Sequence, residues 1–451
     1  MVASPDGRAR TLKEAFQLCD VGPLGSDEEI RRYYVDLSAV RSSVAIRSVS
    51  TRLDFLAVGQ FDSLLFTGHR GCGKSTELQR LGRELGQSHR VIYVETDTEI
   101  DSMDADYTDL YLVIIKQVSN DLAKLGLSFD QTLLTAFENW FKEITDETEE
   151  SVEKSVSLAT TAEAGMEIPF LSKLMTKLLA QIRGSNVQKQ KIRSTLQRDI
   201  GRLKDDMNRL LFDAFEKVKA AGCEKGYLII FDNLDRVPLV VGDRLYFDYA
   251  NQLQDLNCTL IYTAPISVVY SDKNLNNAFG RPNVMPMVNI YNFSAARGLH
   301  LQHNLDFVKK LAQLVVKRID HKVLFAADQL VIELAKASGG HVRQLMQMTA
   351  ASCLTAATRG HTQVEADDVK YAIQQEQINF QRVIPSHHYP LLVDVCKTKQ
   401  IDQNEDGQKM LFNTSVLEYE TDDKSWHYIN PVVKGSPYFI EAVAAAEGDG
   451  D

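Results

Sequence analysis

An eight-residue segment near residue 70 has the residue types that bind a polyphosphate. It reads Gly68-His69-Arg70-Gly71-Cys72-Gly73-Lys74-Ser75 and matches the pattern G-x-x-x-x-G-K-[ST]. The glycines let backbone N–H groups turn toward phosphate oxygens, Lys74 supplies a positive charge, and the Ser75 hydroxyl suits Mg²⁺. A helix is predicted from Thr76 to residue 85, and its N-terminus favours negative charge. Residues 68–76 are therefore the predicted phosphate site.

A second chemical element is the apolar run at 226–232, which ends in a carboxylate. Asp232 is predicted to hold Mg²⁺ together with Ser75, because the carboxyl end of a parallel strand lies beside the phosphate loop. The next residue, Asn233, has no carboxylate to accept a proton from water. Asp235 reaches the same space if the turn bends back, and it is the candidate catalytic base. The alternative is a structural acid that pairs with Arg236 or with a backbone amide.

Strand and helix patterns indicate how these residues are positioned. Apolar strand patterns occur at 64–66, 90–95, 226–232, 258–263 and 284–290, with helical stretches between them. This alternation predicts an α/β fold built on a parallel sheet, with the ligand at the carboxyl ends of the strands.

Composition narrows the class of protein. The chain has 451 residues, 44% hydrophobic and 25% charged, which is typical of soluble proteins with several domains. Six cysteines without a C-x-x-C pair argue against a disulfide framework or a zinc ribbon. We expect a cytoplasmic protein without membrane contact, because neither a signal segment nor a long apolar run is present. The net charge of −11 argues against a general nucleic-acid coat.

The two phosphate-site motifs, followed by helical patterns at 305–319, 326–337, 342–356 and 366–380, resemble the AAA+ class and its STAND relatives. The resemblance implies a P-loop NTPase core that binds ATP and Mg²⁺, with an all-helical lid that responds to the nucleotide. It also implies catalytic roles for three residues. Thr263 would contact the γ-phosphate or its water, and Arg343, which follows Gly339-Gly340-His341-Val342, would reach the phosphates from the lid. Arg281 would be an arginine finger for a neighbouring subunit, with Arg244 and Arg297 as alternatives.

The predicted organisation has six parts. They are an N-terminal segment (1–40), a core (41–100 and 226–298), a large helical insert (101–225), the lid (299–383), a winged-helix-like module (384–440) and an acidic tail (441–451). The module is predicted from helices at 389–399 and 408–413 and a hairpin at 416–429. It is poor in basic residues, which favours docking to a protein over binding to DNA.

Charge is divided within the insert. Residues 138–167 are rich in acids, whereas 173–204 are rich in lysine and arginine. These blocks could pair with each other, pair across subunits, contact a phosphate backbone or form solvated helix faces. Upstream of the phosphate loop, Tyr34 or Val35 could supply a surface that faces the base, and both are equally plausible as core residues.

The leading hypothesis is an ATP-binding, slowly hydrolysing switch that controls assembly into a homo-oligomer or a protein effector. The resemblance implies a role in prokaryotic antiphage or conflict systems. One alternative is a DNA-handling AAA+ ATPase that uses the basic stretch 173–204. Another is a nucleotide-dependent scaffold that does not hydrolyse ATP.

Overall fold

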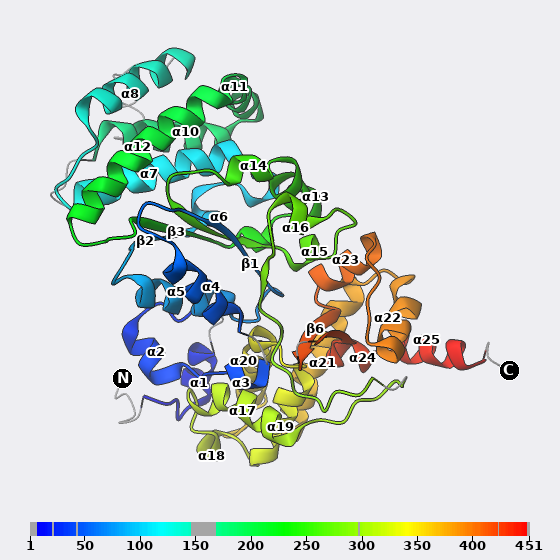
Figure 1. The fold of residues 1–451 in the computed structure, drawn as a ribbon. Coiled ribbons are helices and arrows are strands. Elements are labelled where there is room, and N and C mark those ends of the chain that lie inside the picture. The colour runs from blue at the N-terminus through cyan, green and yellow to red at the C-terminus, as the bar shows by residue number, and fades with distance from the viewer. Residues whose placement is uncertain are drawn as a thin grey trace.

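A five-stranded parallel sheet lies at the centre of the molecule (Figure 1). The computed structural model describes residues 7–19, 22–41, 44–145, 168–295, 298–422 and 424–448. The strand order is β2-β3-β4-β1-β5, and every neighbouring pair is parallel. The strands are β1 (Ser63–Thr67), β2 (Arg90–Glu95), β3 (Tyr227–Asp232), β4 (Thr259–Ala264) and β5 (Asn283–Val284). The predicted α/β class is confirmed.

Helices cover both faces of this sheet, which explains its continuous apolar strands. Every residue of β3 and β4 is buried. Leu64 and Phe66 of β1 pack with helices α4 (Ala45–Phe55) and α5 (Lys74–Leu85), in a core that continues into the C-terminal half of the chain. Leu65 points to the opposite face and packs in a second core with the insert.

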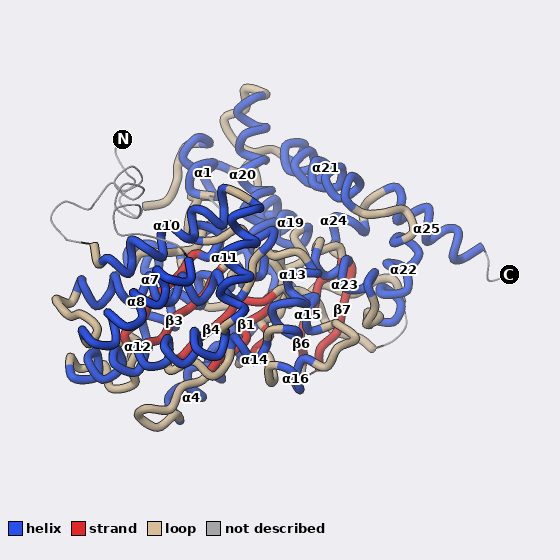
Figure 2. The backbone as a smooth tube through the Cα atoms, turned by 90° about the horizontal axis from the view of Figure 1, so that it is seen from above, coloured by secondary structure: helices blue, strands red, loops and turns tan. Residues whose placement is uncertain are grey.

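In the described part of the range 101–225, five α-helices form the layer over this second face (Figure 2). They are α7 (Tyr107–Lys124), α8 (Gln131–Thr145), α10 (Phe170–Gly184), α11 (Asn186–Arg198) and α12 (Ile200–Ala220). The core of this layer is continuous with the sheet. Short helical elements connect the strands and the insert helices. They are α6 (Thr96–Glu99), η1 (Ser102–Asp104), η2 (Leu234–Arg236), α13 (Leu239–Asp243), η3 (Arg244–Asp248), α14 (Ala250–Leu253), α15 (Ile266–Val269) and α16 (Leu275–Ala278).

Helices also fill the range predicted for the lid. They are α17 (Leu305–Val316), α18 (His321–Leu324), α19 (Asp328–Ala337), α20 (Val342–Thr358) and α21 (Ala366–Val383). The N-terminal helices α1 (Leu12–Leu18), α2 (Asp27–Tyr33) and α3 (Ser38–Arg41) precede the core, and α1 packs against α20. None of the helices in the described ranges is both long enough and apolar enough to span a bilayer.

The C-terminal module consists of two helices followed by a hairpin. Helices α22 (His388–Thr398) and α23 (Glu405–Phe412) precede strands β6 (Val416–Thr421) and β7 (Lys424–Ile429), which pair antiparallel. Short α24 (Pro431–Lys434) and then α25 (Pro437–Gly448) follow. Helix α25 occupies most of the range predicted to be an acidic tail, and its Phe439 is buried.

The fifth strand is much shorter than predicted. Only Asn283 and Val284 pair with β1, whereas the sequence pattern predicts a strand over 284–290. The following chain stays extended but hydrogen-bonds elsewhere. Met287 N donates to Glu418 O at 2.9 Å and Asn289 N donates to Val40 O at 3.0 Å. Its apolar residues therefore join the core to the C-terminal module and to α3.

Candidate functional site

The glycine-rich loop lies between β1 and α5, at the carboxyl edge of the sheet. It borders a pocket of about 690 Å³, within the range of about 300–1,000 Å³ typical of small-molecule sites. This strand, loop and helix arrangement is that of a P-loop, with Gly73 at the start of α5. Charged side chains line the pocket beside this loop. Apolar groups from Leu24, Tyr34, Val35, Leu314 and Met346 also line it.

Lys74 is buried at the floor of this pocket, and all of its donors are engaged. Its Nζ donates to the carbonyl oxygens of Gly68 and His69, both at 2.9 Å. The same nitrogen lies 2.7 Å from Asp235 Oδ2. Burial alone would lower the pKa of Lys74, but Asp235, Cys72 and Asp232 together outweigh it, and the net direction is upward. Lys74 is therefore a fully charged group.

Asp232 and Ser75 are held together by Tyr93 from the neighbouring strand β2. The Tyr93 hydroxyl donates to Asp232 Oδ2 at 2.6 Å and contacts the Ser75 carbonyl oxygen at 3.4 Å. Asp232 Oδ1 accepts from the Asn233 N–H at 2.8 Å. Both Ser75 and Asp232 line the pocket. A hydroxyl and a carboxylate are the hard oxygen donors that Mg²⁺ prefers, so these residues fit the predicted metal site.

A left-handed turn after β3 brings Asp235 back to the pocket. Asn233 has a φ of 68°, a conformation that asparagine tolerates better than most residues. Its side chain donates to Asp97 Oδ1 at 2.9 Å. The chain then enters η2, where Asp235 faces Lys74 and Arg236 pairs with Asp97. Asp235 is thus paired with Lys74, and the alternative pair with Arg236 does not form.

Thr263 lies near the carboxyl end of β4, where its hydroxyl meets the turn that follows β3. Its side chain is fully buried and does not line the pocket. The hydroxyl donates to Phe231 O and accepts from the Leu234 N–H, both at 3.0 Å. Thr263 therefore fixes the turn that carries Asp235, and its hydroxyl is not directed at a phosphate.

The lid reaches the phosphate loop through the first turn of α20. Arg343 N donates to Gly71 O at 3.1 Å, and a Cβ on Gly71 would lie 2.4 Å from His341 Cε1, so only glycine fits there. The Arg343 side chain lines the pocket, and its Nε is buried without a hydrogen-bond partner among the described residues. Burial and the charges of Arg236 and Arg70 lower the pKa of Arg343. The positive charges of Arg343, Arg236 and Arg70 would therefore favour binding of an anion here.

The C-terminal module contacts the other side of the same loop. His69 Nε2 accepts a hydrogen bond from the Glu418 N–H at 2.8 Å, and this imidazole is fully buried. Burial lowers the pKa of His69 well below its ordinary value, so the ring is neutral. Next to it, the Arg70 guanidinium lies 5.6 Å from the centre of the Phe412 ring. The loop thus contacts both the lid and the module.

Most of the predicted site residues converge on the pocket. Those that line it are Arg70, Gly71, Cys72, Gly73, Lys74, Ser75, Thr76, Asp232, Asp235 and Arg343. Gly68 and His69 do not line it, since their carbonyl groups hold Lys74 instead. Arg281 is exposed on the loop before β5 and also lies outside the lining.

Several pocket residues have no signature in the sequence. Arg41 donates to Cys72 O from α3, and Arg318 approaches from the lid. Glu95 ends β2 directly beside Asp232 in the strand register, and Asp97 follows it. The strand-end position of Glu95 is a signal that could have identified it. Arg41 and Arg318 become part of the pocket only through tertiary packing.

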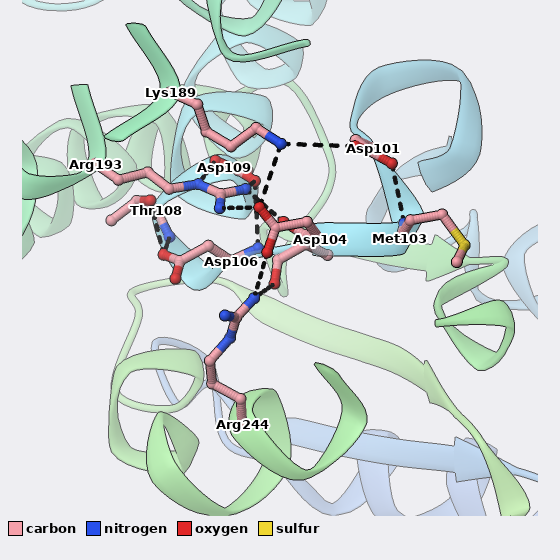
Figure 3. Close-up of polar contacts among 10 residues, drawn as sticks. Asp101, Met103, Asp104, Asp106, Thr108, Asp109, Lys189, Arg193 and Arg244 are labelled. Carbon is pink, nitrogen blue, oxygen red and sulfur yellow. Dashed lines mark hydrogen bonds and ion pairs between the residues drawn. The ribbon is translucent and has the colours of Figure 1, made fainter. Parts of the chain in front are cut away.

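The basic stretch 173–204 is largely paired within the chain. Figure 3 shows Asp104 between Lys189, Arg193 and Arg244, with nitrogen–oxygen distances of 3.2, 2.8 and 3.0 Å. Arg193 also pairs with the buried Asp109. Arg244 is therefore engaged in its own subunit, which weakens it as an alternative to Arg281, and Arg297 lies outside the described residues. Most of the acidic block 138–167 also lies outside them.

Other basic side chains of this stretch have partners too. Lys204 pairs with Asp255 at 2.9 Å, Arg202 lies over the Trp140 ring, and Arg183 donates to Thr98 O. The contacts of Lys204 and Arg183 attach insert helices to the core, and that of Arg202 joins α12 to α8. These contacts leave fewer cations for a phosphate backbone than the sequence pattern suggests.

No protein-family model matches the chain, and no curated protein matches it in sequence. Similar solved structures include the ORC2 protein of Aeropyrum pernix with ADPNP and ADP (TM-score 0.39, 10% identity, 90% of this chain and 93% of that chain). Another is a Walker-type ATPase of Pyrococcus abyssi (0.39, 12%, 92% and 98%). A third is the Aeropyrum pernix ORC1 protein in complex with DNA (0.36, 12%, 93% and 97%).

Proposed function

We propose that this protein is an AAA+-type ATPase of the STAND kind, in which bound ATP controls the position of the lid and of the C-terminal module. The observation that carries the proposal is the convergence on one phosphate loop of Lys74, Asp232, Asp235 and Arg343. Lys74 and Arg343 supply charge for the phosphates. Ser75 and Asp232 would hold Mg²⁺, which when bound neutralises phosphate charge.

Asp235 is the proposed base for hydrolysis. In this structure its carboxylate is paired with Lys74, and that pair would compete with a bound phosphate for the same ammonium group. Binding of a triphosphate would draw Lys74 toward the phosphate oxygens and free the carboxylate to accept a proton from water. Hydrolysis would then begin only in a filled site. Slow turnover suits a switch, because each ATP then keeps one conformation for a long time.

The coupling to the rest of the molecule would start at the loop backbone. Gly71 O accepts from Arg343 of the lid, and His69 accepts from Glu418 of the module. A ligand shifts a conformational equilibrium only by its different affinities for the two states. Phosphates that contact both the loop and Arg343 would provide that difference. The module, which we propose to be a winged helix, would then engage a protein effector or a second copy of this chain.

The direct test is the mass of the protein in solution with ADP, with a non-hydrolysable ATP analogue with Mg²⁺, and without nucleotide. We expect the ATP analogue to change the assembly state of the wild type and to leave Lys74→Ala unchanged. Because Lys74→Ala leaves Asp235 buried and unpaired, its thermal midpoint is measured alongside. A folded wild type without Mg²⁺-dependent nucleotide affinity would contradict the proposal.

Two further measurements separate the alternatives. Tight ATP binding without phosphate release would identify a non-hydrolysing scaffold. Duplex DNA affinity that falls steeply with salt concentration would indicate a DNA-handling ATPase. A role in antiphage defence is the most specific form of the switch proposal, and phage challenge of cells with wild-type or Lys74→Ala protein tests it.

A further inference from the structure

Two histidines and a carboxylate meet in the C-terminal module, at a site that the nucleotide pocket does not include. His387 and His388 are the N-cap and the first residue of α22, and Asp406 lies in the first turn of α23. His388 Nε2 lies 3.2 Å from Asp406 Oδ1, and His387 Nε2 lies 3.5 Å from the same oxygen. One donor atom from each of the three residues lies within 4.8 Å of the other two.

We propose that His387, His388 and Asp406 form a Zn²⁺ site. Imidazole nitrogen and carboxylate oxygen are donors that Zn²⁺ prefers, whereas Mg²⁺ and Ca²⁺ prefer oxygen alone. In a tetrahedral site with bonds of about 2.0–2.1 Å, neighbouring donor atoms are about 3.3 Å apart. The two distances to Asp406 lie on either side of that value. The ligand nitrogens of the two histidines lie within 4.8 Å of each other, and the exposed His387 ring has room to move closer to admit the ion.

The surroundings suit a site with three protein ligands and one open position. His388 is buried, and its main-chain N–H donates to Pro385 O at 3.0 Å, which fixes the start of α22. The Asn404 side chain caps α23 by accepting from the Gly407 N–H at 2.8 Å. The His387 side chain is 64% exposed. The ion would therefore be reached from the His387 side, where water could complete its coordination.

The two imidazole rings also pack against each other. Their planes are at 84°, edge to face, and their centroids are 4.6 Å apart. Elsewhere in the described ranges, single histidines pair with a carboxylate, as His361 does with Asp368 at 2.9 Å. Among the described residues, the 387–388–406 group combines three ligands at metal-binding distances.

The ion would link the two helices of the module. Asp406 lies in the first turn of α23, and Phe412, which contacts Arg70 of the phosphate loop, ends this helix. Fixing α23 against α22 would therefore make the surface that faces the loop more rigid. This inference about the metal is independent of the proposed switch, since it needs neither nucleotide binding nor hydrolysis.

The test uses the full-length, tag-free protein after treatment with a chelator. Calorimetric titration with Zn²⁺ is expected to show one ion per chain, and Co²⁺ is expected to give the visible absorption of a four-coordinate site. His387→Ala removes an exposed ligand and is expected to weaken Zn²⁺ binding at least tenfold, as is Asp406→Asn. The control His361→Ala is expected to bind Zn²⁺ like the wild type. An excess of Mg²⁺ should not displace the ion.

Two results would overturn the proposal. One is the absence of stoichiometric Zn²⁺ binding to folded wild type, which would identify a hydrogen-bonded cluster only. The other is equal Zn²⁺ affinity in wild type and His387→Ala when circular dichroism shows that both are folded. The affinity of the zinc-free wild type and variants for nucleotide with Mg²⁺ is measured in parallel. This measurement distinguishes failure of the zinc site from failure of the nucleotide site.

Discussion

At the scale of single residues, the pair between Lys74 and Asp235 is the central feature of the pocket. Both groups are nearly inaccessible to solvent, with exposed side-chain fractions of 4% and 9%. Removing one partner of such a pair leaves an uncompensated buried charge, which costs about 3–5 kcal/mol. Changes here therefore affect folding as well as chemistry, and an amide that keeps the shape of the carboxylate is the better probe.

Asp235→Asn is expected to lower ATP turnover by about 100-fold, because the amide cannot accept a proton from water. Mg²⁺-dependent ATP affinity is expected to remain within about threefold, since Lys74 is then free to meet the phosphates. Steady-state phosphate release and nucleotide titration measure the two effects. Glu95→Gln is assayed in parallel, because Glu95 is the nearest strand-end carboxylate to Asp232 in the register. If Glu95→Gln loses turnover and Asp235→Asn retains it, Asp235 is not the base.

Arg343→Ala is expected to reduce ATP affinity about tenfold more than ADP affinity. Its guanidinium lines the pocket with an unpartnered Nε, a charge that a γ-phosphate would satisfy. Arg343→Lys is expected to recover little of the loss, because a lysine lacks the planar fork. Arg382, exposed at the end of α21, provides the control Arg382→Ala. An equal loss of ATP and ADP affinity would place Arg343 away from the γ-phosphate.

At the scale of elements, β6 of the module is coupled to the loop through Glu418. Burial raises the pKa of this carboxyl to about 7, although the Ser425 hydroxyl donates to it at 2.8 Å. Between pH 4.5 and 7 the folded state therefore binds more protons than the unfolded state. This contribution to stability is present at low pH and is lost as pH rises through 7.

Glu418→Gln is expected to remove that pH dependence, because the amide keeps the hydrogen bond and does not ionise. Denaturant unfolding at pH 5 and pH 8 measures it. The wild type is expected to lose about 2–3 kcal/mol more than the variant over this interval, at about 1.4 kcal/mol per unit of pKa. Glu441→Gln, at an exposed site on α25, is the control. The same pH dependence in wild type and Glu418→Gln would contradict the assignment.

Local sequence patterns predicted strands and helices well where buried residues recur at regular strand or helix spacing. Residues 90–95 form β2 as predicted, and the four long lid helices begin within two residues of their predicted starts. The prediction fails over 284–290, where an apolar extended segment bonds to Glu418 and Val40 in place of a strand. The hydrogen bonds of Thr263 could not be predicted either, because the sequence does not reveal which backbone groups its hydroxyl contacts. The contact between His69 and Glu418 spans 349 residues, which no local pattern reveals.

At the scale of the whole molecule, Arg281 tests whether activity needs a neighbouring subunit. Its side chain is exposed beside β5 and lies outside its own pocket, as a group donated to a second copy would be. Arg281→Ala alone is expected to lose at least tenfold in turnover while retaining ATP affinity.

Mixing Arg281→Ala with Asp235→Asn is expected to restore part of the activity. In mixed assemblies, an Asp235→Asn subunit can supply Arg281 to a site whose Asp235 is intact. Phosphate release at a series of mixing ratios measures this complementation, and mixing two samples of the same variant is the control. Full activity of Arg281→Ala alone would show that this arginine serves no neighbour.

The hydrogen bond between the His69 ring and the Glu418 main chain also limits how the polypeptide can be dissected. Truncation after α21 would remove the hydrogen-bond donor of the buried His69 ring. Leaving that nitrogen without a partner would lower the free energy of unfolding by about 1–3 kcal/mol. The truncation would also uncover Gly339, against which Pro431 and Leu417 are closely packed. A fragment that lacks residues 384–451 is thus expected to expose apolar surface and to hold the glycine-rich loop less firmly, because His69 and Gly339 both pack against the C-terminal module.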